Sequence, residues 1–239
     1  MDATARIGGD APVRRRASAT RQRILDGAEA LFSRYGYHAV ALADIAGEAD
    51  VRVALLHYHY GTKEELFAAV IERRAAENVA DLKRSLTEAL AVAGPVEERR
   101  AAIIRAFVRP VIDRSMRGGA GWKNYIRLLA RLANLPQKES FLSSYRSSFD
   151  SIVADYVAAL RTLHPGMDPL DVHWAFYFLQ AASTHILVES GILDRQSDGA
   201  LRSSNLDLVG EKLVDFCAAG FTAFLPRADD RPARTPSKR

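Results

Sequence analysis

The chain has 239 residues, of which 48% are hydrophobic and 26% charged, and this length can bury a sizeable core in one or two domains. No apolar run approaches the roughly 20 residues that cross a bilayer, and a charged-then-apolar secretion signal is missing, so we expect a cytoplasmic protein with no membrane partner. The single cysteine, Cys217, excludes an intrachain disulfide and a thiolate metal cluster.

The net charge of +4 is concentrated at the two ends of the sequence. Residues 1–23 hold six Arg and two Asp, which gives +4, and residues 226–239 give +3, so the residues between them carry −3. A basic arm of this kind suits contact with phosphates, but residues 1–17 taken alone are more typical of a solvated, disordered segment. Prolines among charged residues likewise predict a disordered tail over 226–239.

Between these ends, apolar residues recur at helical spacing and strand-like alternation is hard to find, so we expect an all-α fold. The first expected helix covers about residues 19–35, with Ile24, Ala28 and Phe32 on its apolar stripe. Gly36 ends it, because glycine readily adopts the left-handed conformation that closes many helices.

The segment 42–67 carries the most informative pattern. Two short runs with helical spacing are separated by Asp50, and after the second run a capping box of Thr62 and Glu65 begins a long helix. Two short helices joined by a tight turn are typical of a helix-turn-helix, whose second helix enters the DNA major groove.

This stretch resembles the signature of the TetR family of transcriptional regulators, and the resemblance covers about residues 18–75. A joint match of first helix, turn, aromatic run and capping box is more specific than a helix-turn-helix alone. The resemblance implies nine helices, with a helix-turn-helix DNA-binding domain over 18–65 and a helical ligand-binding and dimerisation domain over 66–225. The matching residues are Ile24–Phe32, Tyr35–Tyr37, Leu42, Asp44, Ile45, Ala46, Val51 and Leu56–Phe67.

Two positions depart from the family pattern. The family usually has Thr or Ser ahead of the second helix, where the hydroxyl caps the helix and contacts phosphate, whereas this chain has Val40 and Ala41. The family also usually has Gly in the turn, where a left-handed residue is required; Asp50 tolerates that conformation less well than Gly but better than most residues.

The second short helix supplies the expected DNA contacts. At its start, Arg52 suits a bidentate bond to guanine, and Val53 or Ala54 suits a thymine methyl group. By resemblance, the positions of Tyr58, His59 and Lys63 contact phosphate oxygens, with His57 beside them. We interpret Tyr60 as a packing residue. His57 and His59 are not expected to bind a metal, since side chains two residues apart lie on different faces of a helix.

The remaining helices are expected at about 63–91, 95–116, 122–134, 138–163, 169–189 and 205–224, with a polar loop over 194–203. Pro110 should kink its helix, and the glycines of 118–121 predict a flexible break. The eighth and ninth helices, 169–189 and 205–224, are strongly apolar and form the expected homodimer interface by resemblance.

A ligand pocket would lie among the four helices between residues 95 and 189. Aromatic residues at helical spacing are more often core than ligand contacts, so each candidate competes with a packing role. The apolar character of the set favours a small hydrophobic or amphipathic effector. The candidates are Phe107, Trp122, Tyr125, Phe141, Trp174, Phe178 and His185.

The sequence therefore predicts a ligand-responsive regulator, a repressor that binds double-stranded operator DNA as a homodimer and is released by an apolar effector. The alternatives are a helical adaptor and an enzyme. The sequence shows no Gly-rich phosphate loop, no nucleophile elbow and no metal-spaced cluster. We therefore expect no catalytic residues, no metal and no cofactor. An adaptor would not need the intact run from Arg52 to Lys63.

Overall fold

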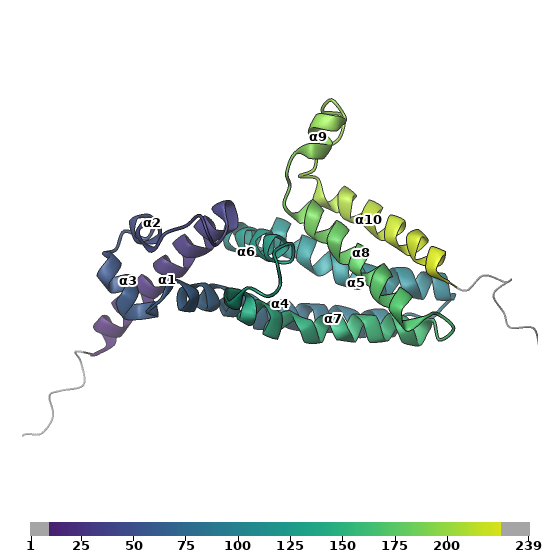
Figure 1. Cartoon of the computed structure of the whole chain (residues 1–239), viewed down its shortest axis with the longest axis horizontal. Coiled ribbons are helices and arrows are strands. Elements are labelled where there is room, and N and C mark those ends of the chain that lie inside the picture. Colours follow the sequence, from purple (N-terminus) through teal and green to yellow (C-terminus); the bar gives the residue numbers. More distant parts are fainter. Residues whose placement is uncertain (1–9, 226–239) are drawn as a thin grey trace, which may run out of the picture. The chain divides into compact units, whose positions relative to one another are not determined.

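The computed structural model describes residues 10–225, and all regular structure in that range is helical, so the predicted all-α fold is confirmed (Figure 1). No helix in this range combines the length and apolar character needed to span a membrane. The predicted contacts of residues 1–9 and the predicted tail over 226–239 lie outside the described residues. The helices are α1 (Asp10–Tyr35), α2 (Leu42–Glu48), α3 (Val53–Tyr60), α4 (Lys63–Leu90), α5 (Val96–Arg117), α6 (Gly119–Leu132), α7 (Ser143–Leu163), α8 (Pro169–Leu187), α9 (Ile192–Gln196) and α10 (Leu206–Phe221), with short 3-10 helices η1 (Ser140–Leu142) and η2 (Thr222–Phe224).

Three elements differ from the expected helices. Helix α1 begins at Asp10 instead of about residue 19, so it includes much of the segment predicted as an arm. The five-residue α9 lies where a loop was predicted, which makes ten α-helices in the described range instead of nine. The expected helix 138–163 is divided into η1 and α7. Short elements such as α9 and η1 contain too few residues for a helical period to be detected.

The chain divides into two compact units, which are described separately. The first comprises residues up to Asn78 together with Asp113–Ser148, and the second comprises Val79–Ile112 and the residues from Phe149 onward. Helix α4 therefore contributes to both units. The segment 113–148, which contains α6 and η1, groups with the helix-turn-helix.

The core of the first unit joins the helix-turn-helix to α6 and η1. Helix α1 packs along α6, and the inner faces of α1, α2, α3 and α4 contribute fully buried residues such as Phe32, Ile45, Leu56 and Phe67. Phe141 of η1 belongs to the same cluster. The short helices α2 and α3 are thus held in place by side chains from distant parts of the sequence.

A buried ion pair connects three helices of this unit. The side chain of Glu29 on α1 is 1% exposed, and both of its oxygens accept hydrogen bonds from Arg74 on α4, at 2.9 and 3.4 Å. The Arg74 guanidinium also lies 5.1 Å from the Trp122 ring of α6, and Arg114 lies 4.2 Å from the same ring. Burial raises the pKa of Glu29, although Arg74 opposes this effect.

The predicted break lies between α5 and α6, and Gly118 and Gly121 are closely packed there. A Cβ on Gly118 would lie 2.6 Å from the Arg114 carbonyl oxygen and from Trp122 Cβ. A Cβ on Gly121 would lie within 3 Å of an Arg74 nitrogen. Small residues are needed here because α6 starts directly against the end of α5 and against the Arg74 side chain.

The core of the second unit contains a polar contact that follows from Pro110. Proline has no backbone N–H, so it leaves the Ala106 carbonyl, four residues earlier in α5, without its helical donor. The Tyr156 hydroxyl of α7 lies 2.8 Å from that carbonyl oxygen and 2.8 Å from the Leu82 carbonyl oxygen. A tyrosine from another helix therefore satisfies the acceptor that proline leaves free.

Helix α10 is fixed on α5 by a close approach and by ion pairs. A Cβ on Gly210 would collide with the Ile112 side chain, so glycine allows the two helices to meet there. Arg109 of α5 pairs with Asp207 at 2.8 Å, and Arg105 pairs with Glu211 at 3.4 Å. Helix α8 packs on the same α10.

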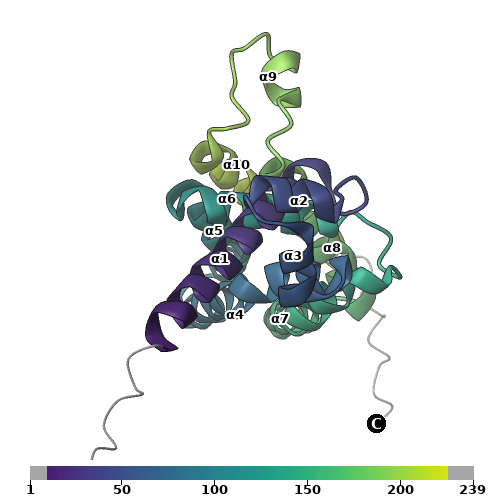
Figure 2. The ribbon, with the colours of Figure 1, turned by 90° about the vertical axis from the view of Figure 1, so that its left-hand side faces the viewer.

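The segment containing α9 projects from α8 and α10 (Figures 1 and 2). Its conformation is fixed locally by Asp194, whose carboxylate accepts hydrogen bonds from the Ser203 N–H at 2.8 Å and the Ser203 hydroxyl at 2.5 Å. These donors lower the pKa of Asp194.

Candidate nucleic-acid interface

Helix α3 has one buried face and one exposed face. Leu56 and Tyr60 are buried, and the Tyr60 hydroxyl donates to the Arg21 carbonyl at 3.3 Å, so the interpretation of Tyr60 as a packing residue is confirmed. On the other face Tyr58 is 82% exposed. The candidates Arg52, Val53 and Ala54 are exposed at the start of the helix. Most of the candidate DNA contacts are thus exposed on α3, whereas His59 and Lys63 are partly buried.

The turn before α3 has the geometry that the sequence predicts. Asp50 has a φ of +50°, which confirms the expected left-handed residue. The Ala49 N–H donates to Ile45 and the Val51 N–H donates to Ala46, so the backbone of the turn is hydrogen-bonded back to α2. The side chain of Asp50 is 99% exposed and lies 3.9 Å from Arg23.

The start of α2 lacks a side-chain cap from the residue that precedes it. Ala41 occupies this position, and it has no group that can accept a hydrogen bond from the helix. The Asp44 carboxylate accepts from the Ala41 N–H at 2.8 Å. The hydroxyl that the family usually places here is thus absent, while one backbone N–H is still satisfied from within the helix.

The start of α4 carries the predicted capping box. The Glu65 N–H donates to the Thr62 hydroxyl oxygen at 3.1 Å, and the Glu65 carboxylate accepts from the Thr62 N–H at 2.7 Å. Thr62 also donates its hydroxyl proton to Glu65 at 2.9 Å, and these bonds lower the pKa of Glu65. The capping box is confirmed, and it fixes the position of Lys63 beside α3.

Lys63 does not extend freely into solvent. Its ammonium nitrogen lies 4.4 Å from the centre of the Tyr37 ring, and partial burial lowers its pKa, with Asp44 opposing. Tyr37 in turn stacks on Phe141 with ring centres 3.9 Å apart. The cation is therefore held over an aromatic face, which restricts its rotamers in the position expected for a phosphate contact.

The two histidines of α3 differ in their contacts. His57 Nδ1 lies 2.7 Å from the Gly61 carbonyl oxygen, so this nitrogen carries the proton and donates at the end of the helix. His59 packs edge-on against the exposed Tyr58 ring, with centres 5.2 Å apart. Within residues 10–225 no group of three His, Cys, Asp or Glu side chains has the arrangement of a metal site.

Three of the ligand candidates lie in the first unit. The Trp122 ring packs against two guanidinium groups, as described above, and its side chain is 7% exposed. Tyr125 is fully buried and its hydroxyl donates to the Ile71 carbonyl at 3.3 Å. Phe141 packs against Tyr37 and Phe67. The structure gives each of these side chains packing partners within the unit.

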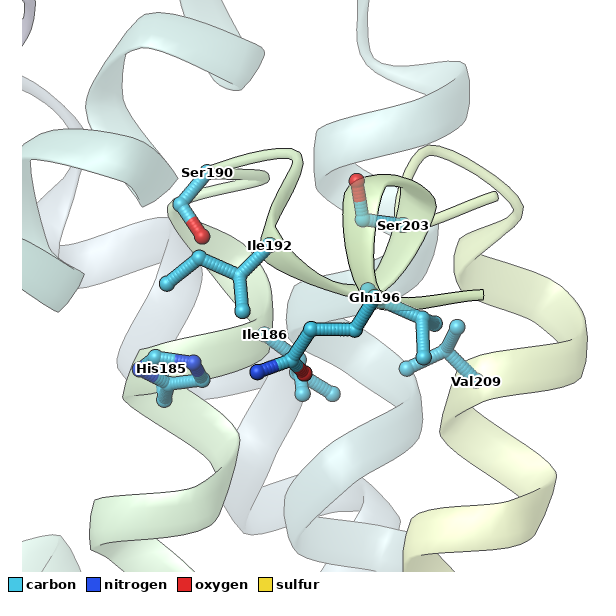
Figure 3. A pocket seen from close by; sticks show the side chains of 8 residues that line it. His185, Ile186, Ser190, Ile192, Gln196, Ser203 and Val209 are labelled. Atoms are coloured by element: carbon cyan, nitrogen blue, oxygen red, sulfur yellow. The ribbon is translucent and has the colours of Figure 1, made fainter. Parts of the chain in front are cut away.

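The other four candidates lie in the second unit and do not form one cluster. Phe107 packs against Tyr156 and Phe176 in the core, with ring centres 5.2 and 5.0 Å away. Trp174 and Phe178 of α8 are 54% and 52% exposed and stack on each other at 5.9 Å. His185 lines a pocket of about 250 Å³ between α8, α9 and α10, with Ile186, Ile192 and Val209 (Figure 3). As ligand contacts, these residues stay a prediction.

An apolar surface extends over α8 and α10. Trp174, Tyr177 and Phe178 are exposed on α8, and Phe216 is 75% exposed on α10. A groove of about 410 Å³ opens between these helices and η2. Its lining residues are Ala175, Phe178, Phe216, Cys217, Gly220, Phe221 and Phe224.

Comparison with known proteins shows what this arrangement represents. Residues 24–70, which contain the helix-turn-helix, match the model of the bacterial regulatory proteins of the tetR family. Residues 105–220 match the model of the tetracyclin repressor-like C-terminal domain. The chain belongs to the TetR family. The order of the two matches along the chain agrees with the order of DNA-reading and carboxy-terminal helices in the structure.

Individual relatives of this TetR-family chain are similar over parts of their length. The A-factor receptor protein of Streptomyces griseus is 28% identical over 127 residues, which are 52% of this chain and 46% of that protein. The negative transcriptional regulator IcaR of the biofilm operon in Staphylococcus epidermidis is 38% identical over 52 residues, 22% of this chain and 28% of its own length. The chain thus spans less than half of either curated relative.

A solved structure shows the same fold over a greater length. In the complex of SmeT with triclosan, the SmeT chain is 21% identical, with a TM-score of 0.55. The match covers 92% of this TetR-family chain and 99% of SmeT. Because the match covers 92% of the chain, the likeness extends through both units.

Sequence reasoning missed the aromatic support of Lys63. Tyr37 was assigned only to the exit of the first helix, and Phe141 only to the ligand candidates, yet the two rings stack directly. The sequence contains no local signal for this contact, because about a hundred residues separate the two positions. A lysine that follows a capping threonine gives no indication in the sequence of the aromatic ring that packs against it.

Proposed function

We propose that this TetR-family chain is a transcription regulator that binds double-stranded operator DNA through α3 and represses the adjacent promoter. The observation that carries this proposal is the exposure of Arg52, Val53, Ala54 and the 82% exposed Tyr58 on α3. IcaR, which resembles the chain over 52 residues, is named a negative regulator, and this supports repression.

Each exposed group has a separate role in this proposal. Arg52 reads a guanine through two hydrogen bonds, and Val53 or Ala54 contacts a thymine methyl group. Tyr58, His59 and Lys63 contact phosphate oxygens, and His57 lies beside them. Lys63 is suited to this task because the Tyr37 ring holds its ammonium group in place and α4 begins at its position, so the helix amides add to the positive field.

Selection of bound sequences from a random duplex library, followed by measured affinities, tests the DNA role. Lys63→Ala should weaken binding to every duplex and reduce the salt slope by about one unit. Arg52→Ala should cost about 1–3 kcal/mol on the selected operator and relax one base position. An equal loss on operator and random duplex would make Arg52 a phosphate contact, and enrichment of no sequence would remove the regulator proposal.

We propose further that two copies associate through α8 and α10. The exposed rings of Trp174, Phe178 and Phe216, with the groove beside them, are the kind of apolar surface that subunit interfaces cover. Phe216→Asp should separate the subunits, whereas the exposed Leu90→Asp on α4 is the matched control and should not. Sedimentation velocity distinguishes the species, since one chain has a mass of 26.3 kDa. A wild-type protein that stays monomeric when concentrated would contradict the proposal.

The effector in this proposal is a small, largely apolar molecule bound among α5, α7 and α8 of the second unit, and α4 transmits its binding. Helix α4 starts at the capping box beside α3 and continues into the residues of the second unit. A dimer on DNA needs its two reading helices about 34–36 Å apart. An effector that favours another separation releases the operator, and by linkage operator lowers effector affinity by the same factor.

A paired titration tests the switch. Effector candidates are titrated into the protein alone and into the protein saturated with operator, and the two affinities are compared. Equal affinities would show that the bound molecule does not control DNA binding. The complex of SmeT with triclosan shows that a protein of this fold holds a small molecule. We place the protein in the cytoplasm with its DNA, and we assign it no catalytic role.

A further inference from the structure

Helix α1 carries four exposed arginines, two of which lie close to residues on either side of α3. It begins at Asp10 and therefore converts part of the basic amino-terminal segment into a rigid helix. Arg15, Arg16, Arg21 and Arg23 are all exposed on it. In Figure 2 the first turns of α1 project to one side of α3. A helix, unlike a flexible arm, presents each of these charges in a fixed direction.

Two of the arginines lie near the two ends of α3. Arg23 lies 3.9 Å from Asp50, in the turn that leads into α3. The Arg21 guanidinium lies 5.7 Å from the ring of Tyr60, the last residue of α3, and the Tyr60 hydroxyl donates to the Arg21 carbonyl. The surface formed by these arginines is thus continuous with the surface that the proposed function assigns to DNA.

Helical geometry places Arg16 on the same side of α1 as Arg23, and Arg15 on a different side. Seven residues rotate by about 700°, which is nearly two full turns, so Arg16 lies in line with Arg23 and about 10 Å further along α1. Nine residues rotate by about 900°, so Arg15 lies on the face opposite the fully buried Ile24. Adjacent arginines in the sequence therefore face different surroundings.

Arg16 and Arg21 have no ion-pair partner among residues 15–225, the range over which side chains are described. Arg23 has only the exposed Asp50. Exposed pairs of that kind contribute little and exchange readily for a stronger anion. The phosphate backbone of a duplex bound at α3 would be such an anion for these arginines.

We propose that Arg16, Arg21 and Arg23 of α1 bind phosphates of the operator backbone beyond those contacted by α3 and the start of α4. This extends the footprint by about 10 Å, or roughly three base-pair steps. The inference rests on the proposed DNA-binding function and adds a second contact surface to it. Arg15 takes no part, because it lies on the outer face of the helix.

The test compares two neighbouring arginines on one duplex. Because phosphate contacts are independent of sequence, a labelled random duplex of 30 base pairs is a sufficient probe, and fluorescence anisotropy is followed from 50 to 300 mM salt. Arg16→Gln should reduce the salt slope by about 0.9 and weaken binding roughly five- to ten-fold at 0.1 M salt. Arg15→Gln, which removes the same charge, should leave the slope unchanged, and Arg16→Lys should restore it.

The outcomes separate this inference from the proposed function. A wild-type protein that binds no duplex even at 50 mM salt would overturn both. Wild-type binding with equal slopes for Arg16→Gln and Arg15→Gln would overturn the inference alone, because net charge would then matter and position would not. Loss of binding to phosphatidylserine vesicles by Arg16→Gln, with DNA binding unchanged, would assign the arginines to a membrane surface and also overturn it. Circular dichroism checks that the exposed substitutions preserve the helix.

Discussion

The contact between Tyr156 and the carbonyl freed by Pro110 leads to a quantitative prediction. Replacing Tyr156 with Phe keeps the ring, which packs against Phe107 and Phe176, and removes only the hydroxyl. The Ala106 carbonyl then has no donor, because residue 110 has no N–H. A buried acceptor without a partner costs about 1–3 kcal/mol, so we expect the free energy of unfolding to fall by about 2 kcal/mol.

A second substitution isolates the cause. In a Pro110→Ala background the backbone N–H of residue 110 returns to the Ala106 carbonyl, so losing the Tyr156 hydroxyl should cost only about 0.5–1 kcal/mol, the usual net worth of one hydrogen bond. The two changes should therefore couple by roughly 1 kcal/mol. Urea unfolding of wild type, both single variants and the double variant, with constant m-values, measures this coupling.

A matched control uses the other buried tyrosine. The Tyr125 hydroxyl donates to the Ile71 carbonyl, but that carbonyl also has a helical donor in the N–H of Ala75. Tyr125→Phe should therefore cost less than Tyr156→Phe. The reasoning would be refuted if the effect of Tyr156→Phe were the same, within about 0.5 kcal/mol, with proline or alanine at position 110.

Three further predictions follow from groups described above. Glu29→Gln should cost about 3 kcal/mol of unfolding free energy because it leaves a largely buried arginine without its anion, whereas Asp26→Asn, in an exposed pair, should cost below about 1 kcal/mol; equal losses in urea unfolding would contradict this. Asp50→Gly should gain about 0.5–1 kcal/mol by relieving a left-handed φ, and Asp50→Asn, which keeps the Cβ, should gain less. Burial raises the pKa of Tyr125 and Tyr156, so both stay neutral in the folded protein when the unfolded chain ionises near pH 10. Their contribution to stability should be constant below that pH and fall above it, and a flat stability between pH 9 and 11 would disprove this.

The features that the sequence predicts correctly are local ones. The capping box of Thr62 and Glu65 involves residues three apart, and its hydrogen bonds occur as expected. The left-handed Asp50 follows from the place of one residue in a short turn. Tyr60 is buried because its spacing continues the apolar face of α3. In each case one stretch of chain contains all the groups that decide the geometry.

The features that the sequence does not predict depend on residues far apart in the chain. Helical spacing indicates that Trp122 and Phe141 are inside the protein but not what they pack against. Their partners come from α4, from the end of α5 and from the segment that follows α1. The glycines at 118–121 look like a flexible break because composition does not reveal how closely a neighbouring arginine approaches. Helix α9 is too short to have a period of its own.

The two tryptophans have a practical consequence because they lie in different units and in opposite environments. Trp122 is 7% exposed between two guanidinium groups of the first unit, and Trp174 is 54% exposed on α8 of the second. Each unit therefore has its own intrinsic fluorophore. With one of them replaced by Phe, the emission of the other reports on a single unit: Trp122 follows the melting of the DNA-reading helices, and Trp174 shifts to shorter wavelength if a second subunit covers it. Unfolding of the first unit and association through α8 can then be followed separately in an unlabelled protein.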